Sequence, residues 1–123
     1  MEQSTVLSGA TITAKAYSIF QRLRLLDNIN YQSIFKSLDP NKNRSQIFSS
    51  GEASGASGSF FFFSHDKRFI VKTVSNAEMK LIEDILPDFY THFKQNPDSL
   101  LARIYGVYSV NMKDYAPVNL ILM

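Results

Sequence analysis

Two short β-forming segments with a polar turn between them constrain this chain more than any other feature. The first is Phe60–Phe63, a run of four phenylalanines, and the second is the largely β-branched run Phe69–Val74. The residues between them, Ser64–Arg68, are all polar or charged. Aromatic and β-branched side chains favour strands, so this pattern predicts a β-hairpin. The hairpin follows a Gly/Ser-rich stretch at residues 49–59.

A capping signal directly after the hairpin predicts a helix. Ser75 lies three residues before Glu78, and this spacing lets the serine oxygen accept a backbone N–H while the glutamate reaches back. Pro87 is expected to end this helix or to begin another one. The apolar residues that recur at helical spacing are Leu81, Ile82, Ile85, Leu86, Phe89, Tyr90 and Phe93.

Shorter elements are predicted before the hairpin. Residues 1–9 are small and polar and are expected to be flexible. Residues 10–16 alternate between polar and apolar side chains, which predicts a strand. Residues 17–26 and 31–38 have apolar side chains at helical spacing, and the Asp-Pro-Asn-Lys-Asn sequence at 39–43 predicts a turn.

The segments after the helix are predicted as strands at residues 101–110 and 118–123. The order from the hairpin onward is therefore strand, strand, helix, strand, strand. This order predicts an α+β fold, a mostly antiparallel sheet with packed helices. The length of 123 residues allows one domain with one core.

The composition excludes several classes of protein. There is no cysteine, so disulfide frameworks and thiolate metal sites are excluded, and two histidines are too few for a typical zinc enzyme. No run of 18 apolar residues and no secretory signal is present, so we expect an intracellular chain. The net charge of +2 hints at an anionic partner without distinguishing phosphate, nucleic acid and anionic lipid.

The most informative combination is the Gly/Ser stretch, Lys72 and Glu78. Gly55 and Gly58 allow backbone N–H groups to approach an anion closely. Lys72, on the second strand of the hairpin, can reach phosphates beneath that loop, and Glu78 can hold its ammonium group. Protein kinases use this arrangement to bind nucleotides. The same residues also fit a structural interpretation, with a flexible approach to the hairpin, a solvent-reaching lysine and a capping glutamate.

Other functional motifs are absent. The chain contains neither G-x-G-x-x-G nor a P-loop. His65 and His92 are expected to be solvated rather than catalytic. The phenylalanine run suggests base stacking, but four consecutive residues place two rings on each face of a sheet, where core packing explains them. No nucleic-acid partner is therefore expected.

The segment Gly58–Thr73 closely resembles the phosphatidylinositol phosphate kinases. That family has a Ser-Gly-Ser core followed by aromatic residues, then Ser-His-Asp, and then a Phe-Ile-x-Lys-Thr strand. Here these features stand at 57–59, 64–66 and 69–73. The resemblance extends over residues 10–123 and includes Ala16–Arg24, where Tyr17 replaces the family's proline, Ile85–Tyr90, Gln95–Pro97, Ser99–Leu101 and Ile104–Tyr108.

The resemblance implies a set of nucleotide-binding residues. Lys72 would contact the nucleotide phosphates, and Glu78 would pair with it. Ile70 would line the adenine pocket, and Met123 would contact adenine from the hinge. The phosphate-covering loop would consist of Ser57, Gly58 and Ser59. No catalytic and no metal-binding residue is expected in this chain.

The resemblance also implies a wider function. Residues 10–123 would be the N-terminal lobe of a lipid kinase domain truncated at the hinge, with the catalytic aspartate, the metal-binding aspartate and the lipid-selecting segment after it. The family transfers the ATP γ-phosphate to the inositol ring of a phosphatidylinositol phosphate, with Mg²⁺, at the cytoplasmic face of membranes. The expected partners are this lipid in an anionic membrane, the C-terminal lobe and a second copy of the chain.

Two hypotheses follow for the chain itself. In the first it is the N-terminal lobe of a lipid kinase and is inactive alone. In the second it is a stand-alone, non-catalytic module that binds a membrane or a protein. The coding sequence after Met123 discriminates them, because an in-frame continuation favours the first hypothesis. Whether the chain takes part in catalysis stays open at this point.

Overall fold

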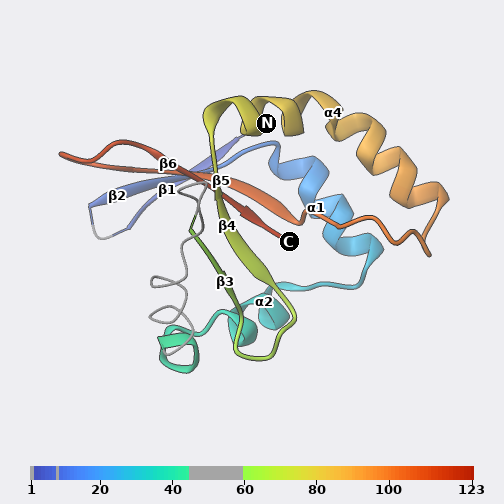
Figure 1. The fold of residues 1–123 in the computed structure, drawn as a ribbon, viewed down its shortest axis with the longest axis horizontal. Coiled ribbons are helices and arrows are strands. Elements are labelled where there is room, and N and C mark those ends of the chain that lie inside the picture. The colour runs from blue at the N-terminus through green and yellow to red at the C-terminus, as the bar shows by residue number, and fades with distance from the viewer. Residues whose placement is uncertain (1, 8, 45–59) are drawn as a thin grey trace.

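The structure is a computed structural model that describes residues 2–7, 9–44 and 60–123. Its six-stranded sheet has the order β1-β2-β5-β6-β4-β3, and every neighbouring pair is antiparallel (Figure 1). The strands are β1 (Gln3–Leu7), β2 (Ala10–Ala14), β3 (Phe61–Phe63), β4 (Ile70–Val74), β5 (Gly106–Met112) and β6 (Val118–Leu122). The helices are α1 (Tyr17–Leu26), α2 (Tyr31–Ser37) and α4 (Asn76–Gln95). The predicted α+β class is confirmed.

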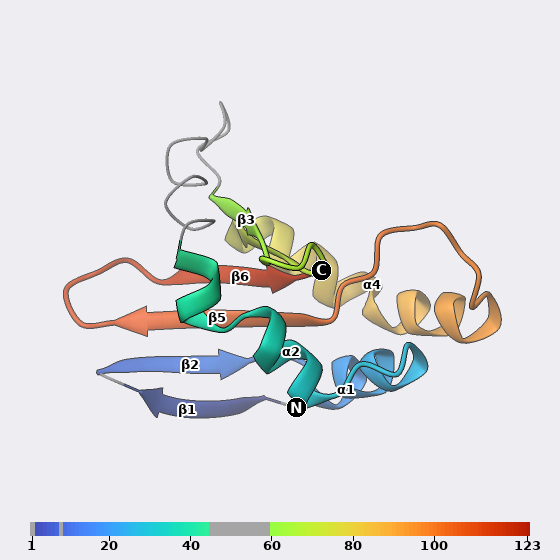
Figure 2. The ribbon, with the colours of Figure 1, turned by 90° about the horizontal axis from the view of Figure 1, so that it is seen from below.

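Helices cover both faces of the sheet. Figures 1 and 2 show α4 on one face, α2 on the opposite face, and α1 beside α4 near one end of the strands. Successive residues of a strand point to opposite faces of the sheet. Runs of consecutive apolar residues in these strands therefore place apolar side chains on both faces. In β6, for example, Ile121 packs in the core beneath α4, whereas Leu120 and Leu122 line a cavity with Ile34 of α2.

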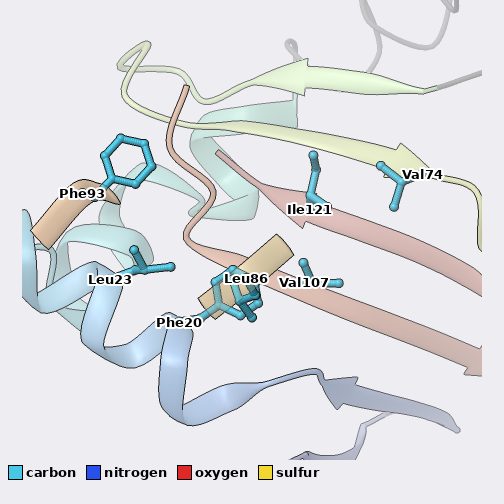
Figure 3. Close-up of a cluster of buried hydrophobic side chains, with 7 residues drawn as sticks. All are labelled: Phe20, Leu23, Val74, Leu86, Phe93, Val107 and Ile121. Carbon is cyan, nitrogen blue, oxygen red and sulfur yellow. The ribbon is translucent and has the colours of Figure 1, made fainter. Parts of the chain in front are cut away.

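The main core lies between α1, α4 and the sheet. Figure 3 shows these side chains pointing toward one another from the helices and the strands. Phe20 and Phe93 are 1% and 2% exposed, and the ring of Phe89 meets that of Phe93 edge-on with centroids 4.6 Å apart. The buried cluster consists of Phe20, Leu23, Val74, Leu86, Phe93, Val107 and Ile121.

The opposite face has a smaller apolar contact beneath α2. Ile34 and Leu38 face Val71 and Tyr108 across a cavity of about 210 Å³.

The glycine at the start of β5 is explained by Tyr108 on the same face, because a Cβ at Gly106 would lie 2.5 Å from the Tyr108 hydroxyl oxygen. Gly106 therefore leaves the space that the tyrosine ring occupies.

The structure differs from the sequence prediction at the N-terminus. Residues 1–9 were expected to be flexible, but Gln3–Leu7 form β1 and pair with β2. The two strands are joined by a turn in which Gly9 has a φ of +80°, a conformation that glycine adopts without strain. The prediction failed because a polar edge strand lacks the apolar alternation that identifies a half-buried strand.

The helix predictions also need two corrections. The segment 39–43 is not a simple turn, since residues 40–44 are helical. Asp39 begins this helix by accepting a hydrogen bond from the Asn41 amide at 2.9 Å, and proline is favoured at the first helical position. Pro87 does not interrupt α4, which continues from Asn76 to Gln95. Pro87 is exposed, and buried side chains on both sides of it, Leu86 and Phe93, hold the helix on the sheet.

The predicted strand at 101–110 begins later than expected. β5 starts at Gly106, and residues 101–105 form an irregular segment between α4 and the sheet. Its backbone is held by the Tyr105 amide, which donates to the Leu122 carbonyl at 2.7 Å. The second part of the prediction, the strand 118–123, is confirmed as β6 over Val118–Leu122.

The core predicts a large difference between two phenylalanines that both lie on helices. Phe20→Ala should lower the free energy of unfolding by roughly 3–5 kcal/mol, since it leaves a cavity in the core. Phe35 is 72% exposed, so Phe35→Ala should change it by no more than about 0.5 kcal/mol. Urea unfolding followed by circular dichroism measures both values. Equal losses for the two variants would contradict this description of the core.

Candidate functional site

The register of β3, β4 and β6 places candidate residues on one face of the sheet. Lys72 stands between Phe61 of β3 and Ile121 of β6, and Ile70 stands opposite Phe63. Directly opposite residues in antiparallel strands share a face. The rings of Phe61 and Phe63 contact each other edge-on, with centroids 6.1 Å apart. Half-buried Lys72 is therefore presented beside two partly exposed aromatic rings at an edge of the sheet.

The structure brings Ile70 and Met123 together. Their backbones exchange two hydrogen bonds, each of 2.9 Å, which extend the pairing of β4 and β6. Both side chains line a cavity of about 360 Å³, which we call the base pocket. Its walls are Phe63, Lys67, Arg68, Ile70, Leu101, Ala102, Arg103, Tyr105 and Met123. It is an open pocket with apolar and aromatic side chains and a basic rim, which suits a flat aromatic ligand that carries negative charge.

Glu78 lies at the start of α4 and caps it. The Ser75 side chain accepts a hydrogen bond from the Glu78 amide at 3.1 Å and donates one of 3.1 Å to the Glu78 carboxylate. Within the described residues the ion pairs are Lys15–Glu2 and Arg103–Asp27, so the expected pairing of Glu78 with Lys72 is not present in this structure. The capping box, which the sequence also predicted, is confirmed.

The predicted loop residues Ser57, Gly58 and Ser59 lie outside the described residues. Their position relative to Lys72 is therefore not part of the site described here, and their role stays a prediction.

A polar network holds the segment that forms one wall of the base pocket. Arg24 donates to the Tyr105 carbonyl at 2.7 Å, and Arg103 forms an ion pair with Asp27. The Tyr105 hydroxyl donates to Asp27 at 2.8 Å, and burial together with Asp27 raises the pKa of Tyr105 to about 12. This phenol therefore stays protonated at neutral pH and keeps donating. The sequence did not reveal this network, because its partners are 76 to 81 positions apart.

Side-chain hydrogen bonds, which the sequence did not predict, hold the turn of the β3–β4 hairpin. Ser64 is fully buried and donates to Asp66 at 2.6 Å, and Ser37 of α2 donates to the same carboxylate at 2.6 Å. These two hydrogen bonds lower the pKa of Asp66 to about 2, so its carboxylate is charged at neutral pH. His65, expected to be solvated, is half-buried, and its Nε2 lies 3.0 Å from the Lys36 carbonyl oxygen.

Two kinds of site are not found in the described part of the chain. No group of three or more His, Cys, Asp or Glu side chains there is arranged to hold a metal ion. None of the helices in those residues is long and apolar enough to span a bilayer.

Comparison with known proteins identifies similar sequences over most of the chain. The sequence profile of the family described as Phosphatidylinositol-4-phosphate 5-Kinase matches residues 42–123. Over 105 residues, 85% of this chain, the sequence is 40% identical to a Dictyostelium discoideum protein named "Probable phosphatidylinositol phosphate kinase". Over an equal length it is 35% identical to a phosphatidylinositol 4-phosphate 5-kinase of Schizosaccharomyces pombe. A human type-1 alpha phosphatidylinositol 4-phosphate 5-kinase is 47% identical over 58 residues, 47% of this chain.

The chain is much shorter than these relatives. It covers 15% of the Dictyostelium protein, 14% of the fission-yeast protein and 10% of the human protein.

The capping box predicts how substitutions at the start of α4 behave. Ser75→Ala should lower the free energy of unfolding by about 1 kcal/mol, because it leaves the Glu78 amide without its acceptor. Glu78→Gln should have a much smaller effect, because glutamine also completes a capping box. Urea unfolding measures both effects. A larger loss for Glu78→Gln than for Ser75→Ala would show that the glutamate charge has a partner other than the helix start.

Proposed function

Because the chain belongs to the phosphatidylinositol phosphate kinase family, we propose that residues 10–123 form the ATP-covering lobe of such a kinase. In this proposal the lobe binds the nucleotide whose γ-phosphate is transferred to the inositol ring of a phosphatidylinositol phosphate. Since the chain spans 15% or less of the relatives described above, this activity is proposed for the lobe together with a C-terminal lobe.

The observation that carries the proposal is the shared face of Ile70 and Lys72. Ile70 and Met123 line the base pocket, and Lys72 lies two positions further along β4 on the same face. Two residues of a strand span roughly 7 Å, and a lysine side chain extends this reach further. Adenine in the pocket would therefore direct its phosphates toward Lys72, whose ammonium group can form charge-assisted hydrogen bonds with phosphate oxygens.

The remaining predicted residues receive roles on the same basis. We assign Ser57, Gly58 and Ser59 to the loop that covers the phosphates, because glycine lets backbone N–H groups approach an anion. Glu78 is assigned as the partner of Lys72 in the nucleotide-bound lobe, where its second carboxylate oxygen can accept from the ammonium group while the first keeps its hydrogen bond with Ser75. Mg²⁺ accompanies ATP in phosphoryl transfer, and no residue of this chain is assigned as its ligand.

An uneven distribution of charge supports the proposed membrane partner. The α2 segment, residues 31–44, contains three basic residues and one acidic residue, a net charge of +2. The helix on the opposite face, α4, contains two basic and four acidic residues, a net charge of −2. An anionic membrane attracts the first side and repels the second.

Two exposed aromatic residues reinforce this orientation. Tyr31 and Phe35 lie one helical turn apart on α2, are 65% and 72% exposed, and have ring centroids 6.3 Å apart. Aromatic side chains among basic ones favour the interface between lipid headgroups and acyl chains. We propose that the α2 side faces the cytoplasmic membrane surface. This surface would also serve the alternative function, a non-catalytic module that binds a membrane or a protein. The expected second copy of the chain stays a prediction.

Nucleotide binding tests the assignment of Lys72. Lys72→Met should weaken ATP binding by roughly 10- to 100-fold, the effect of losing a charged hydrogen bond. It should leave adenosine binding nearly unchanged, because adenosine has no phosphate. Fluorescence competition or calorimetry with the two ligands measures both affinities.

Lys80→Met, an exposed lysine on α4, is the matched control and should leave both affinities unchanged. The purified 123-residue chain should bind ATP without phosphorylating lipid. Lipid phosphorylation by this chain that disappears in Lys72→Met would contradict the proposal that it needs a second lobe.

Vesicle binding tests the proposed membrane side. The pair Lys42→Gln and Arg44→Gln should weaken binding to phosphatidylserine-containing vesicles by roughly 10- to 30-fold, at about 1 kcal/mol per charge. The matched control is the pair Lys80→Gln and Lys94→Gln on α4, which should not weaken it. Sedimentation with vesicles at two salt concentrations measures the effect. Equal losses for the two pairs would contradict the proposed orientation.

A further inference from the structure

A polar cluster that is buried except for the exposed Asp66 joins α2 to the turn of the β3–β4 hairpin. We call the four side chains Ser37, Asn43, Ser64 and Asp66 the turn clamp. Ser37 and Ser64 are fully buried, and Asn43 is 1% exposed. The resemblance to lipid kinases assigned no role to any of them, and polar side chains are buried this completely only when their hydrogen bonds are satisfied.

The hydrogen bonds of the turn clamp run in both directions between the two segments. Ser37 donates to one oxygen of the Asp66 carboxylate at 2.6 Å, and Ser64 donates to the other at 2.6 Å. Asn43 accepts from the His65 amide at 2.7 Å and donates to the Ser37 carbonyl at 2.8 Å. His65 and Asp66 of the turn are therefore bonded directly to the segment 37–43, and Ser64 is linked to that segment through Asp66.

The turn clamp also closes the turn itself. The Ser64 hydroxyl oxygen accepts from the amides of Arg68 and Phe69 at 3.1 and 3.0 Å, and the Arg68 amide also donates to Asp66 at 3.2 Å. The Ser64 amide donates to the Phe69 carbonyl at 2.8 Å. Of the four side chains in the turn clamp, Asp66 is the one that bonds to α2, to Ser64 and to the Arg68 amide just before β4.

The two residues that flank this turn belong to the base pocket. Phe63 precedes Ser64, and Ile70 follows Phe69, and both side chains line the pocket. Phe69 is 2% exposed and meets the Tyr105 ring edge-on with centroids 6.2 Å apart, and Tyr105 lines the pocket as well. A change in the turn is therefore transmitted to three pocket walls through covalent neighbours and one aromatic contact.

We propose that Asp66 is a positioning residue that holds the β3–β4 hairpin against α2 and thereby sets the shape of the base pocket. This inference rests on the proposed nucleotide site. Asp66 does not contact the nucleotide in this proposal, and it acts through Phe63, Ile70 and Phe69.

The test compares three variants by their affinity for adenosine. Asp66→Ala removes both acceptors and should weaken adenosine binding by about 10-fold, because binding would then have to restore the order of the turn that the charged hydrogen bonds of Asp66 maintain. Asp66→Asn keeps one acceptor for Ser64 and gains an N–H that can donate to the Ser37 hydroxyl oxygen, so it should stay within about 3-fold of the wild type. Ser37→Ala removes a single bond and should lie between these values.

A second measurement separates positioning from stability. Amide hydrogen exchange at Phe69 should become faster in Asp66→Ala and stay slow in Asp66→Asn, since the Ser64 hydroxyl oxygen holds this amide. The control is Asn119→Ala, which removes hydrogen bonds of 2.7 and 3.0 Å to Asn76 and Ser109 away from the hairpin turn. It should lower the urea midpoint without changing the adenosine affinity.

The outcomes are distinct. Wild-type adenosine affinity in Asp66→Ala, with a lowered urea midpoint, would overturn the inference and leave the nucleotide site intact. Equal losses of affinity in Asp66→Ala and Asn119→Ala would also overturn it, because affinity would then follow stability alone. Failure of the wild-type chain to bind either adenosine or ATP would overturn the proposed function, and the positioning role with it.

Discussion

The two-residue period of β4 is the constraint on which the rest of the structure depends. Ile70, Lys72 and Val74 point to one face, so the pocket wall, the proposed phosphate contact and a core residue follow one another along a single row. Val71 points to the other face, toward α2. A shift of one residue in the pairing of β4 with β6 would exchange these faces. It would bury Lys72 beneath α2 and remove Val74 from the core. The apolar packing beneath α4 therefore also fixes the register of the candidate site.

Much of the fold could be predicted from local signals in the sequence. The aromatic run, the β-branched run and the Ser75–Glu78 capping box each carry their information within a few residues, and the hairpin and α4 form where they predict. The errors occurred where distant contacts outweigh local preference. β1 has no apolar alternation and is held by its pairing with β2. Pro87 removes one backbone hydrogen bond from α4, but the buried neighbours Leu86 and Phe93 keep the helix on the sheet.

The candidate site shows the same division between residues with a local sequence signal and residues placed by distant contacts. Ile70, Lys72 and Met123 were predicted from a motif, and the strand register brings the first two onto one face and pairs Ile70 with Met123. The polar groups that support the pocket carried no such signal. Ser37 and Asp66 are 29 positions apart, and Asn43 stood in a segment predicted to be a simple turn. Their role depends on which elements the fold places side by side, and no periodicity or capping pattern reports that.

The short helix α2 contributes both to the proposed membrane-facing surface and to the hydrogen bonds that hold the β3–β4 hairpin. Its outward side presents Tyr31, Phe35 and Lys36 to solvent, and its inward side buries Ser37 against Asp66. The helix is held to the sheet by Ile34 and Leu38 beneath it and by the turn clamp at its end. The surface proposed to meet an anionic membrane is thus one layer of side chains away from the hairpin that shapes the proposed base pocket. A lobe built in this way carries its membrane-facing residues and its nucleotide-facing residues on opposite sides of the same hydrogen-bonded cluster.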